Sequence, residues 1–256
     1  MTSHGPIAAP SKMLLALEAP RAMVELGLIG PGWPLLRSAP RGDGGPVMLL
    51  PGMAASDRSM GPMHLFLRER GYRTYGWKQG RNVGSQAIIA PLLQRLSALR
   101  RRHNARVQLI GLSLGGIYAR ELARQAPADV RSVITLGSPF KGPHTASNVW
   151  RLYEFLSGDK TADADIGHFA PAPPSVPTTA IFTRSDGIVA WQRCIELPGD
   201  RVESIEVIGS HTGLGHNVMA LYAVADRLAQ ADGAWQPFQA RGPLRALYPD
   251  PWRDRR

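Results

Sequence analysis

Cysteine is almost absent from the sequence, since Cys194 is the single one among 256 residues. One cysteine cannot form an intrachain disulfide, so the fold does not require an oxidising compartment. Spacings typical of zinc ligands are also missing. We therefore expect neither a metal nor another cofactor.

Long apolar runs are missing as well. The run Met13-Leu14-Leu15-Ala16-Leu17 ends at Glu18, whereas a secretory signal needs roughly 7–15 apolar residues and a membrane-spanning helix about 20. We therefore expect a cytoplasmic protein. An amphipathic helix is predicted over residues 11–28, ended by Gly30-Pro31-Gly32. We expect it to pack on the core within an N-terminal helical extension, residues 1–44; lying on a membrane surface is the alternative.

Acidic residues are outnumbered, with 20 Asp and Glu against 30 Lys and Arg and a net charge of +10. Such a balance can favour nucleic acid, an anionic membrane or an acidic substrate. The excess is mostly arginine spread along the chain, with clusters at 100–102 and 253–256. No recognisable nucleic-acid module accompanies it, so we expect no nucleic-acid partner and only a possible weak contact with anionic membranes.

From residue 45 onward, short apolar runs alternate with stretches of helical periodicity. This alternation predicts an α/β fold, a mostly parallel sheet with helices on both faces, in a single domain spanning 1–256. Ligands bind at the carboxyl ends of the strands in such sheets. Strands are expected at 47–50, 73–77, 107–110, 130–136, 178–183 and 202–208, and helices at 62–70, 86–102, 114–125 and 217–228.

One connection between predicted strands is too long for an ordinary loop or crossover. Residues 140–176, after the third-last strand, hold several aromatic residues and then a proline cluster. Long insertions at the ligand-binding face often form lids or substrate walls. We expect a lid or cap here, and a C-terminal tail over 231–256.

A candidate nucleophile lies in Gly111-Leu112-Ser113-Leu114-Gly115, between a predicted strand and a predicted helix. This is the context of a nucleophile elbow, in which a tight, strained turn exposes the serine hydroxyl. Glycines at both ends remove β-carbons that would collide where strand and helix pass closely. We predict that Ser113 is a nucleophile.

A serine hydroxyl is a weak nucleophile and needs a base, whose tautomer an acid must hold. His211 comes about three residues after the last predicted strand, and His216 is the alternative base. Asp186 directly follows a strand, between nucleophile and base. Other acids have weaker contexts: Asp159, Asp163, Asp165, Asp200 and Glu203.

Two backbone N–H groups are expected to bind the oxyanion. One belongs to Leu114, which follows the nucleophile. The other is expected from the loop after an earlier strand, where Gly52 lets the backbone turn inward and Met53 supplies the N–H.

These segments together resemble the α/β-hydrolase lipase and esterase family, most closely its compact bacterial triacylglycerol-lipase-like branch. The resemblance implies acyl-enzyme chemistry on a small-molecule or lipid ester, with Ser113 as nucleophile, His211 as base and Asp186 as its partner. Met53 and Leu114 would be the oxyanion donors. The matching segments span residues 45–230: Pro51-Gly52-Met53, Gly111-Leu112-Ser113-Leu114-Gly115, Leu136-Gly137-Ser138-Pro139, Ser185-Asp186-Gly187-Ile188-Val189 and Ser210-His211-Thr212-Gly213-Leu214.

Other activities are compatible with the same residues. An acyltransferase would pass the acyl group to an alcohol, and a thioesterase or amidase would cleave a different bond. A non-catalytic protein that binds a membrane surface on a hydrolase scaffold is a further alternative, which an intact serine, acid and base disfavour.

Overall fold

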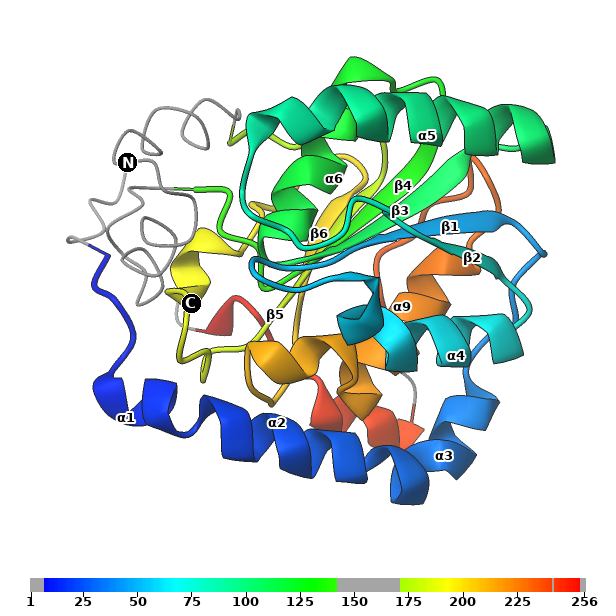
Figure 1. Cartoon of the computed structure of the whole chain (residues 1–256). Coiled ribbons are helices and arrows are strands. Elements are labelled where there is room, and N and C mark those ends of the chain that lie inside the picture. The colour runs from blue at the N-terminus through cyan, green and yellow to red at the C-terminus, as the bar shows by residue number, and fades with distance from the viewer. Residues whose placement is uncertain (1–6, 142–170, 241, 254–256) are drawn as a thin grey trace.

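The computed structural model describes residues 7–141, 171–240 and 242–253. At its centre is a six-stranded sheet in the order β2-β1-β3-β4-β5-β6, and all neighbouring strands are parallel (Figure 1). The strands are β1 Pro46–Leu50, β2 Arg73–Gly76, β3 Val107–Leu112, β4 Val130–Leu136, β5 Thr178–Phe182 and β6 Val202–Glu206. Because β1 and β3 are buried along their whole length, their apolar runs are nearly continuous.

Helices cover both faces of the sheet (Figure 1). On one face, α5 Ile89–His103 and α6 Leu114–Gln125 enclose a core that includes Leu92, Leu96 and Tyr118. On the other face lie α3 Ile29–Ser38, α4 Gly61–Glu69 and α9 Val218–Leu228. The predicted α/β fold with a parallel sheet is confirmed.

Most predicted elements agree with the structure. The helix over 114–125 and the strand over 130–136 have the predicted bounds. The strand predicted over 202–208 ends at Glu206 instead, and Ile208 is 70% exposed. The described residues also form short 3-10 helices: η1 Asp57–Met60, η2 Gln86–Ile88, η3 Trp191–Arg193, η4 Thr212–Gly215 and η5 Gly242–Leu247.

The N-terminal helical stretch breaks at Gly27, within one residue of the predicted end, but Gly30-Pro31-Gly32 does not stop the helical path as predicted. Helices α1 Lys12–Ala16, α2 Glu18–Gly27 and α3 follow one another along one edge of the molecule, and Gly30-Pro31-Gly32 lies in the first turn of α3 (Figure 1). Pro31 fits there because the first turn of a helix needs no intrahelical N–H donor. Gly32 donates to Leu28 O at 2.9 Å, and a β-carbon on it would lie 2.7 Å from a methyl group of Val218 in α9.

The ends of the long insertion are fixed to the core. Arg120 of α6 is buried, forms an ion pair with buried Glu196, and stacks 3.9 Å from the centre of the Phe140 ring. It also donates to the carbonyls of Pro171 and Ala172, at 2.8 and 2.9 Å. Residues 142–170, which make up most of the predicted lid, lie outside the described residues.

The described part of the C-terminal tail runs back along β6. Phe238 N–H donates to Glu203 Oε2 at 2.7 Å, and the Phe238 and Tyr248 rings meet edge to face. Arg253 donates to Glu206 at 2.8 Å. Across the described ranges, no helix is long and apolar enough to cross a membrane.

Candidate active site

Ser113 occupies the tight turn between β3 and α6. Its backbone has φ 51° and ψ −120°, a conformation that costs energy for a residue with a side chain. Its N–H donates to Leu136 O of the neighbouring strand at 2.7 Å. A β-carbon on Gly111 would overlap the backbone of Gly115, and one on Gly115 would overlap the backbone of Leu50. The two glycines therefore allow the strained turn to pack between β1 and the helix.

Asp186 and His211 meet at the same carboxyl edge of the sheet, from the loops after β5 and β6. Asp186 Oδ2 lies 2.6 Å from His211 Nδ1, and both side chains are buried. The other oxygen of Asp186 accepts the N–H groups of Ile188 and Val189, at 2.8 and 2.7 Å. The carboxylate is thus fixed in orientation, and it directs the proton of His211 to Nδ1. Nε2 is then the nitrogen that can accept a proton.

The environment of His211 acts on its pKa in both directions. Burial lowers the pKa, whereas the charge and hydrogen bond of Asp186 raise it, and the charge of Glu18 raises it further. The net shift is upward from the ordinary value of 6.5. Asp186 therefore stabilises the imidazolium form, as a partner of a general base must.

The other described histidines have different surroundings. His216, the alternative base, has Nε2 2.9 Å from the carbonyl oxygen of Ala22, so its ring faces the N-terminal helix. His103 lies 2.7 Å from the Tyr75 hydroxyl on the far end of α5. His4, His144 and His168 lie outside the described residues, as do Asp159, Asp163 and Asp165.

The turn after β1 carries Met53, one of the two predicted oxyanion donors. Ala55 N–H donates to Gly52 O at 3.2 Å, and a β-carbon on Gly52 would lie 3.4 Å from Cβ of Ser113, so the turn approaches the serine closely. Leu114 is the first residue of α6, a position whose N–H has no acceptor within its own helix. The positive end of the helix dipole is at the same place.

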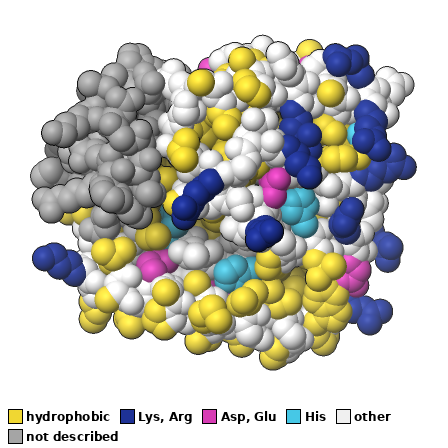
Figure 2. Space-filling model, in the orientation of Figure 1, with side chains coloured by type: hydrophobic (Ala, Val, Ile, Leu, Met, Phe, Trp, Pro, Cys, Tyr) yellow, Lys and Arg dark blue, Asp and Glu magenta, His cyan; other side chains and the backbone are white. Residues whose placement is uncertain are grey.

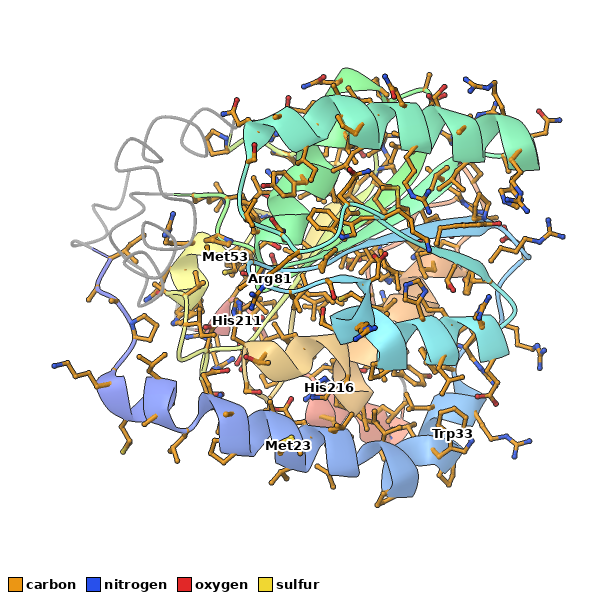
Figure 3. The ribbon with its side chains drawn as sticks, in the orientation of Figure 1. Met23, Trp33, Met53, Arg81, His211 and His216 are labelled. Atoms are coloured by element: carbon orange, nitrogen blue, oxygen red, sulfur yellow. The ribbon has the colours of Figure 1, made fainter. Side chains whose placement is uncertain are left out.

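Asn82, which sequence reasoning did not find, holds this turn. It is buried, and its Nδ2 donates to Pro51 O at 2.9 Å. Its backbone N–H and carbonyl bond to Ala55 and Ala54, at 2.8 and 2.7 Å. Arg81 Nε also donates to Ala54 O, at 2.7 Å. In Figure 3, Met53, Arg81 and His211 lie at the same end of the sheet.

Two buried carboxylates of α2 hold the loops that carry Asp186 and His211, and sequence reasoning missed both. Glu18 Oε1 accepts the N–H of Gly187 at 2.7 Å and that of His211 at 3.2 Å, and Oε2 accepts that of Thr212 at 3.2 Å. Glu18 thus joins the loop of Asp186 to the loop of His211. The only signal in the sequence is an acid within a helix of mostly apolar residues, whose other charges are Arg21 and Glu25.

The second carboxylate, Glu25, binds the base loop alone. Its Oε1 accepts the N–H of Ser210 at 2.7 Å, and its Oε2 accepts Asn217 Nδ2 at 2.8 Å. Between the two acids, Arg21 donates to the carbonyls of Ser185 and Gly209, at 2.7 and 3.1 Å. All three charged side chains of α2 therefore contact the loops that follow β5 and β6.

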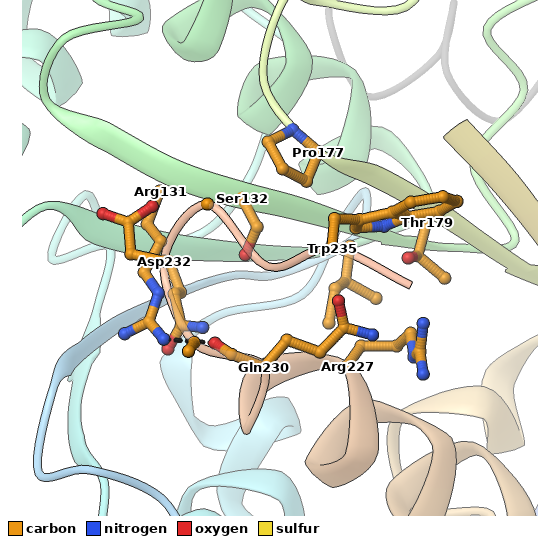
Figure 4. Close-up of a pocket in the computed structure, with 12 residues that line it drawn as sticks. Arg131, Ser132, Pro177, Thr179, Arg227, Gln230, Asp232 and Trp235 are labelled. Atoms are coloured by element: carbon orange, nitrogen blue, oxygen red, sulfur yellow. Dashed lines mark hydrogen bonds between the residues drawn. The ribbon is translucent and has the colours of Figure 1, made fainter. Parts of the chain in front are cut away.

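A hollow of about 30 Å³ lies at the opposite end of the sheet (Figure 4). Its lining includes Gln108, Ser132, Thr179 and Trp235, near the amino ends of β3, β4 and β5. Its size suits one or two water molecules, and ligands of such sheets bind at the carboxyl ends. In residues 7–141, 171–240 and 242–253, no group of histidine, cysteine or acidic side chains could hold a metal ion.

The parallel sheet and the elbow at Ser113 define an α/β-hydrolase fold. No model of a known protein family matches the sequence, and no curated protein matches it. Solved structures do match. Aspergillus fumigatus lipase B has a TM-score of 0.55 at 18% identity, covering 78% of this chain and 58% of that one. This chain therefore spans little more than half the length of that enzyme.

Two further structures match over nearly their whole length. A structure of the metagenome-derived lipolytic enzymes LipS and LipT has a TM-score of 0.55 at 15% identity, covering 74% of this chain and 93% of that one. Paleococcus ferrophilus monoacylglycerol lipase has a TM-score of 0.52 at 13% identity, covering 72% and 96%. At these identities the likeness establishes the fold.

Proposed function

We propose that this chain is a serine hydrolase that cleaves carboxylic esters through Ser113, His211 and Asp186. The observation that carries the proposal is the buried pair of His211 and Asp186, 2.6 Å apart, at the sheet edge where Ser113 holds its strained turn. A serine with such an acid–base pair at the ends of three strands is the arrangement that nucleophilic acyl transfer needs.

In the proposed mechanism, His211 Nε2 takes the Ser113 proton as the hydroxyl oxygen attacks the ester carbonyl. The tetrahedral oxyanion accepts hydrogen bonds from the N–H groups of Met53 and Leu114. His211 then gives the proton to the leaving alcohol, and the acyl group stays on Ser113. Water attacks this acyl-enzyme by the same proton route and releases the acid. Asp186 stabilises the imidazolium in both halves without taking the proton.

The test combines active-site labelling with hydrolysis. A fluorophosphonate probe should label the folded protein at Ser113, and p-nitrophenyl esters of increasing chain length should be hydrolysed. Ser113→Ala should abolish labelling and lower kcat about 10⁴- to 10⁶-fold. Ser97→Ala, on the outer helix α5, is the matched control and should keep both activities. Equal rates for wild type and Ser113→Ala would refute the proposal.

The finer reaction is decided in the same assays. Hydrolysis predicts that an added alcohol leaves free acid as the main product, whereas an acyltransferase would give the new ester. A leaving-group series of matched esters, thioesters and amides separates an esterase from a thioesterase or an amidase. A folded protein that neither takes up the probe nor cleaves any of them would be a binding protein on this scaffold.

A further inference from the structure

The N-terminal helices expose their apolar side chains and bury their charged ones. In α2, the buried side chains are Glu18, Ala22 and Glu25, whereas Met23 and Val24 are 67% and 63% exposed. Amphipathic helices on a globular core do the reverse. We call the exposed set the α1–α2 apolar face, and its members are Met13, Leu15, Leu17, Met23, Val24, Leu26 and Leu28. Figure 2 shows hydrophobic side chains gathered along this lower edge of the molecule.

The charged side chains of α1 and α2 that reach solvent are both positive, exposed Lys12 and half-buried Arg21. Residues 13–36, all of them described, contain only three charged side chains, and none of the three is in the exposed class: Glu18 and Glu25 are buried and Arg21 is half-buried. Along the sequence, the next exposed charges are Lys12 before the stretch and Arg37 after it. Arg37 lies near the exposed acid Glu69, because Arg70 donates to Arg37 O at 2.8 Å and pairs with Glu69. The chain as a whole carries +10.

From this combination we propose that the α1–α2 apolar face docks on an anionic phospholipid surface. Apolar side chains would enter the boundary between headgroups and acyl chains, and the flanking cations would meet lipid phosphates. The helices lie along an outer edge of the molecule, where a flat surface can reach them (Figure 1). The polar side of the helix needs no water because the catalytic loops already bind its charges.

A second copy of the chain would also bury this face. A two-fold axis would place the α1–α2 apolar faces of two copies against each other, together with Lys12 and Arg21 of both. Cations gathered at one interface repel each other, which costs free energy, whereas anionic lipid neutralises them.

Docking would bring the active-site loops close to the lipid. One helix, with a diameter of about 10–12 Å including side chains, separates the apolar face from the loops that Glu18 holds. The inference goes beyond the proposed function and does not depend on it, because adsorption can be measured without turnover.

The test is sedimentation of the full chain with vesicles of phosphatidylcholine alone and with an equal amount of phosphatidylglycerol. Wild type should bind the anionic vesicles, and Met23→Glu with Val24→Glu should weaken that binding about tenfold or more. Leu65→Glu is the matched control, since Leu65 of α4 is 68% exposed but outside the face, and it should bind like wild type. Lys12→Gln with Arg37→Gln should lose roughly fivefold per cation.

All variants should keep the wild-type melting temperature, and their rate on a soluble p-nitrophenyl ester should equal that of wild type. That rate is a separate readout, so loss of vesicle binding is distinguishable from loss of the proposed activity. Absence of wild-type binding to the anionic vesicles, or equal binding by wild type and the Met23/Val24 variant, would overturn the proposal. The proposal would also be overturned if wild type formed a concentration-dependent dimer that only the Met23/Val24 variant lost. That result would assign the face to a second copy.

Discussion

Replacing Glu18 by glutamine tests whether α2 positions the active-site loops. The carboxylate accepts three backbone N–H groups, from Gly187, His211 and Thr212, and it pairs with Arg21 at 3.3 Å. Glutamine has one carbonyl oxygen, so at best it keeps the two bonds of Oε1 and turns its NH₂ group toward the N–H of Thr212. A donor left without an acceptor costs about 1–3 kcal/mol where it is buried, and the Thr212 N–H is part-buried, so we expect unfolding in urea to show a loss of about 1–2 kcal/mol.

The same change should lower catalysis in a way that mere loss of stability would not. Displacement of a catalytic group by about 1 Å can cost 10²-fold in rate, so we expect kcat on a p-nitrophenyl ester to fall about 10- to 100-fold, with KM nearly unchanged. The negative charge of Glu18 helps raise the pKa of His211. His211 must be neutral to act as a base, so activity rises as pH passes its pKa, and Glu18→Gln should move this acid limb of kcat/KM to lower pH.

Glu25→Gln is the matched control. Glu25 is also buried on α2 but bonds only to Ser210 and Asn217, and its charge is not among the causes of the His211 pKa shift. We expect a similar loss of stability with the acid limb in place. A Glu18→Gln enzyme with wild-type kcat and wild-type acid limb, but lowered stability, would refute the positioning role.

Three further predictions concern residues around the site. Glu196→Ala leaves the buried charge of Arg120 without its carboxylate partner and should lower the free energy of unfolding in urea by about 3–5 kcal/mol. Asp232→Ala, which breaks the exposed pair with Arg106, should lower it by at most about 1 kcal/mol. Burial raises the pKa of the Cys194 thiol well above its ordinary value of 9.0, so a thiol reagent should modify it only as fast as the protein unfolds. Asn82→Ala removes the hydrogen bond to Pro51 O in the turn that carries Met53. We expect kcat to fall by up to about 10²-fold, while the fluorophosphonate probe still labels Ser113.

The sequence predicted best those features that depend on residues close together in the chain or on the strand topology. The elbow is readable because its glycines and Ser113 lie within five residues and a strand leads into it. The proximity of Asp186 and His211 was predictable because parallel strands bring their carboxyl ends to one edge. Their separation of 25 residues did not matter, since the topology supplies the contact.

Contacts that depend on distant loops were not predictable. Asn82 bonds to Pro51 across 31 residues, and neither position has a pattern that indicates the other. The end of β6 was misplaced for a different reason. Ile208 directly follows buried Val207 and so lengthens the apolar run at the end of the strand. The chain turns there toward Ser210 and α2, and the Ile208 side chain is left exposed.

The orientation of α2 is the feature that local periodicity could least determine. An apolar stripe defines two faces of a helix, and burial of the stripe is the ordinary outcome. Here the inward face meets backbone N–H groups of two loops, and a carboxylate can accept several such donors at once. Glu18 and Glu25 supply these acceptors, so their hydrogen bonds, formed with residues 169 to 194 positions away, favour the reversed orientation. The apolar side is then left outward, and the hydrogen bonds that hold the two loops are the reason why this helix exposes the face that we propose for lipid docking.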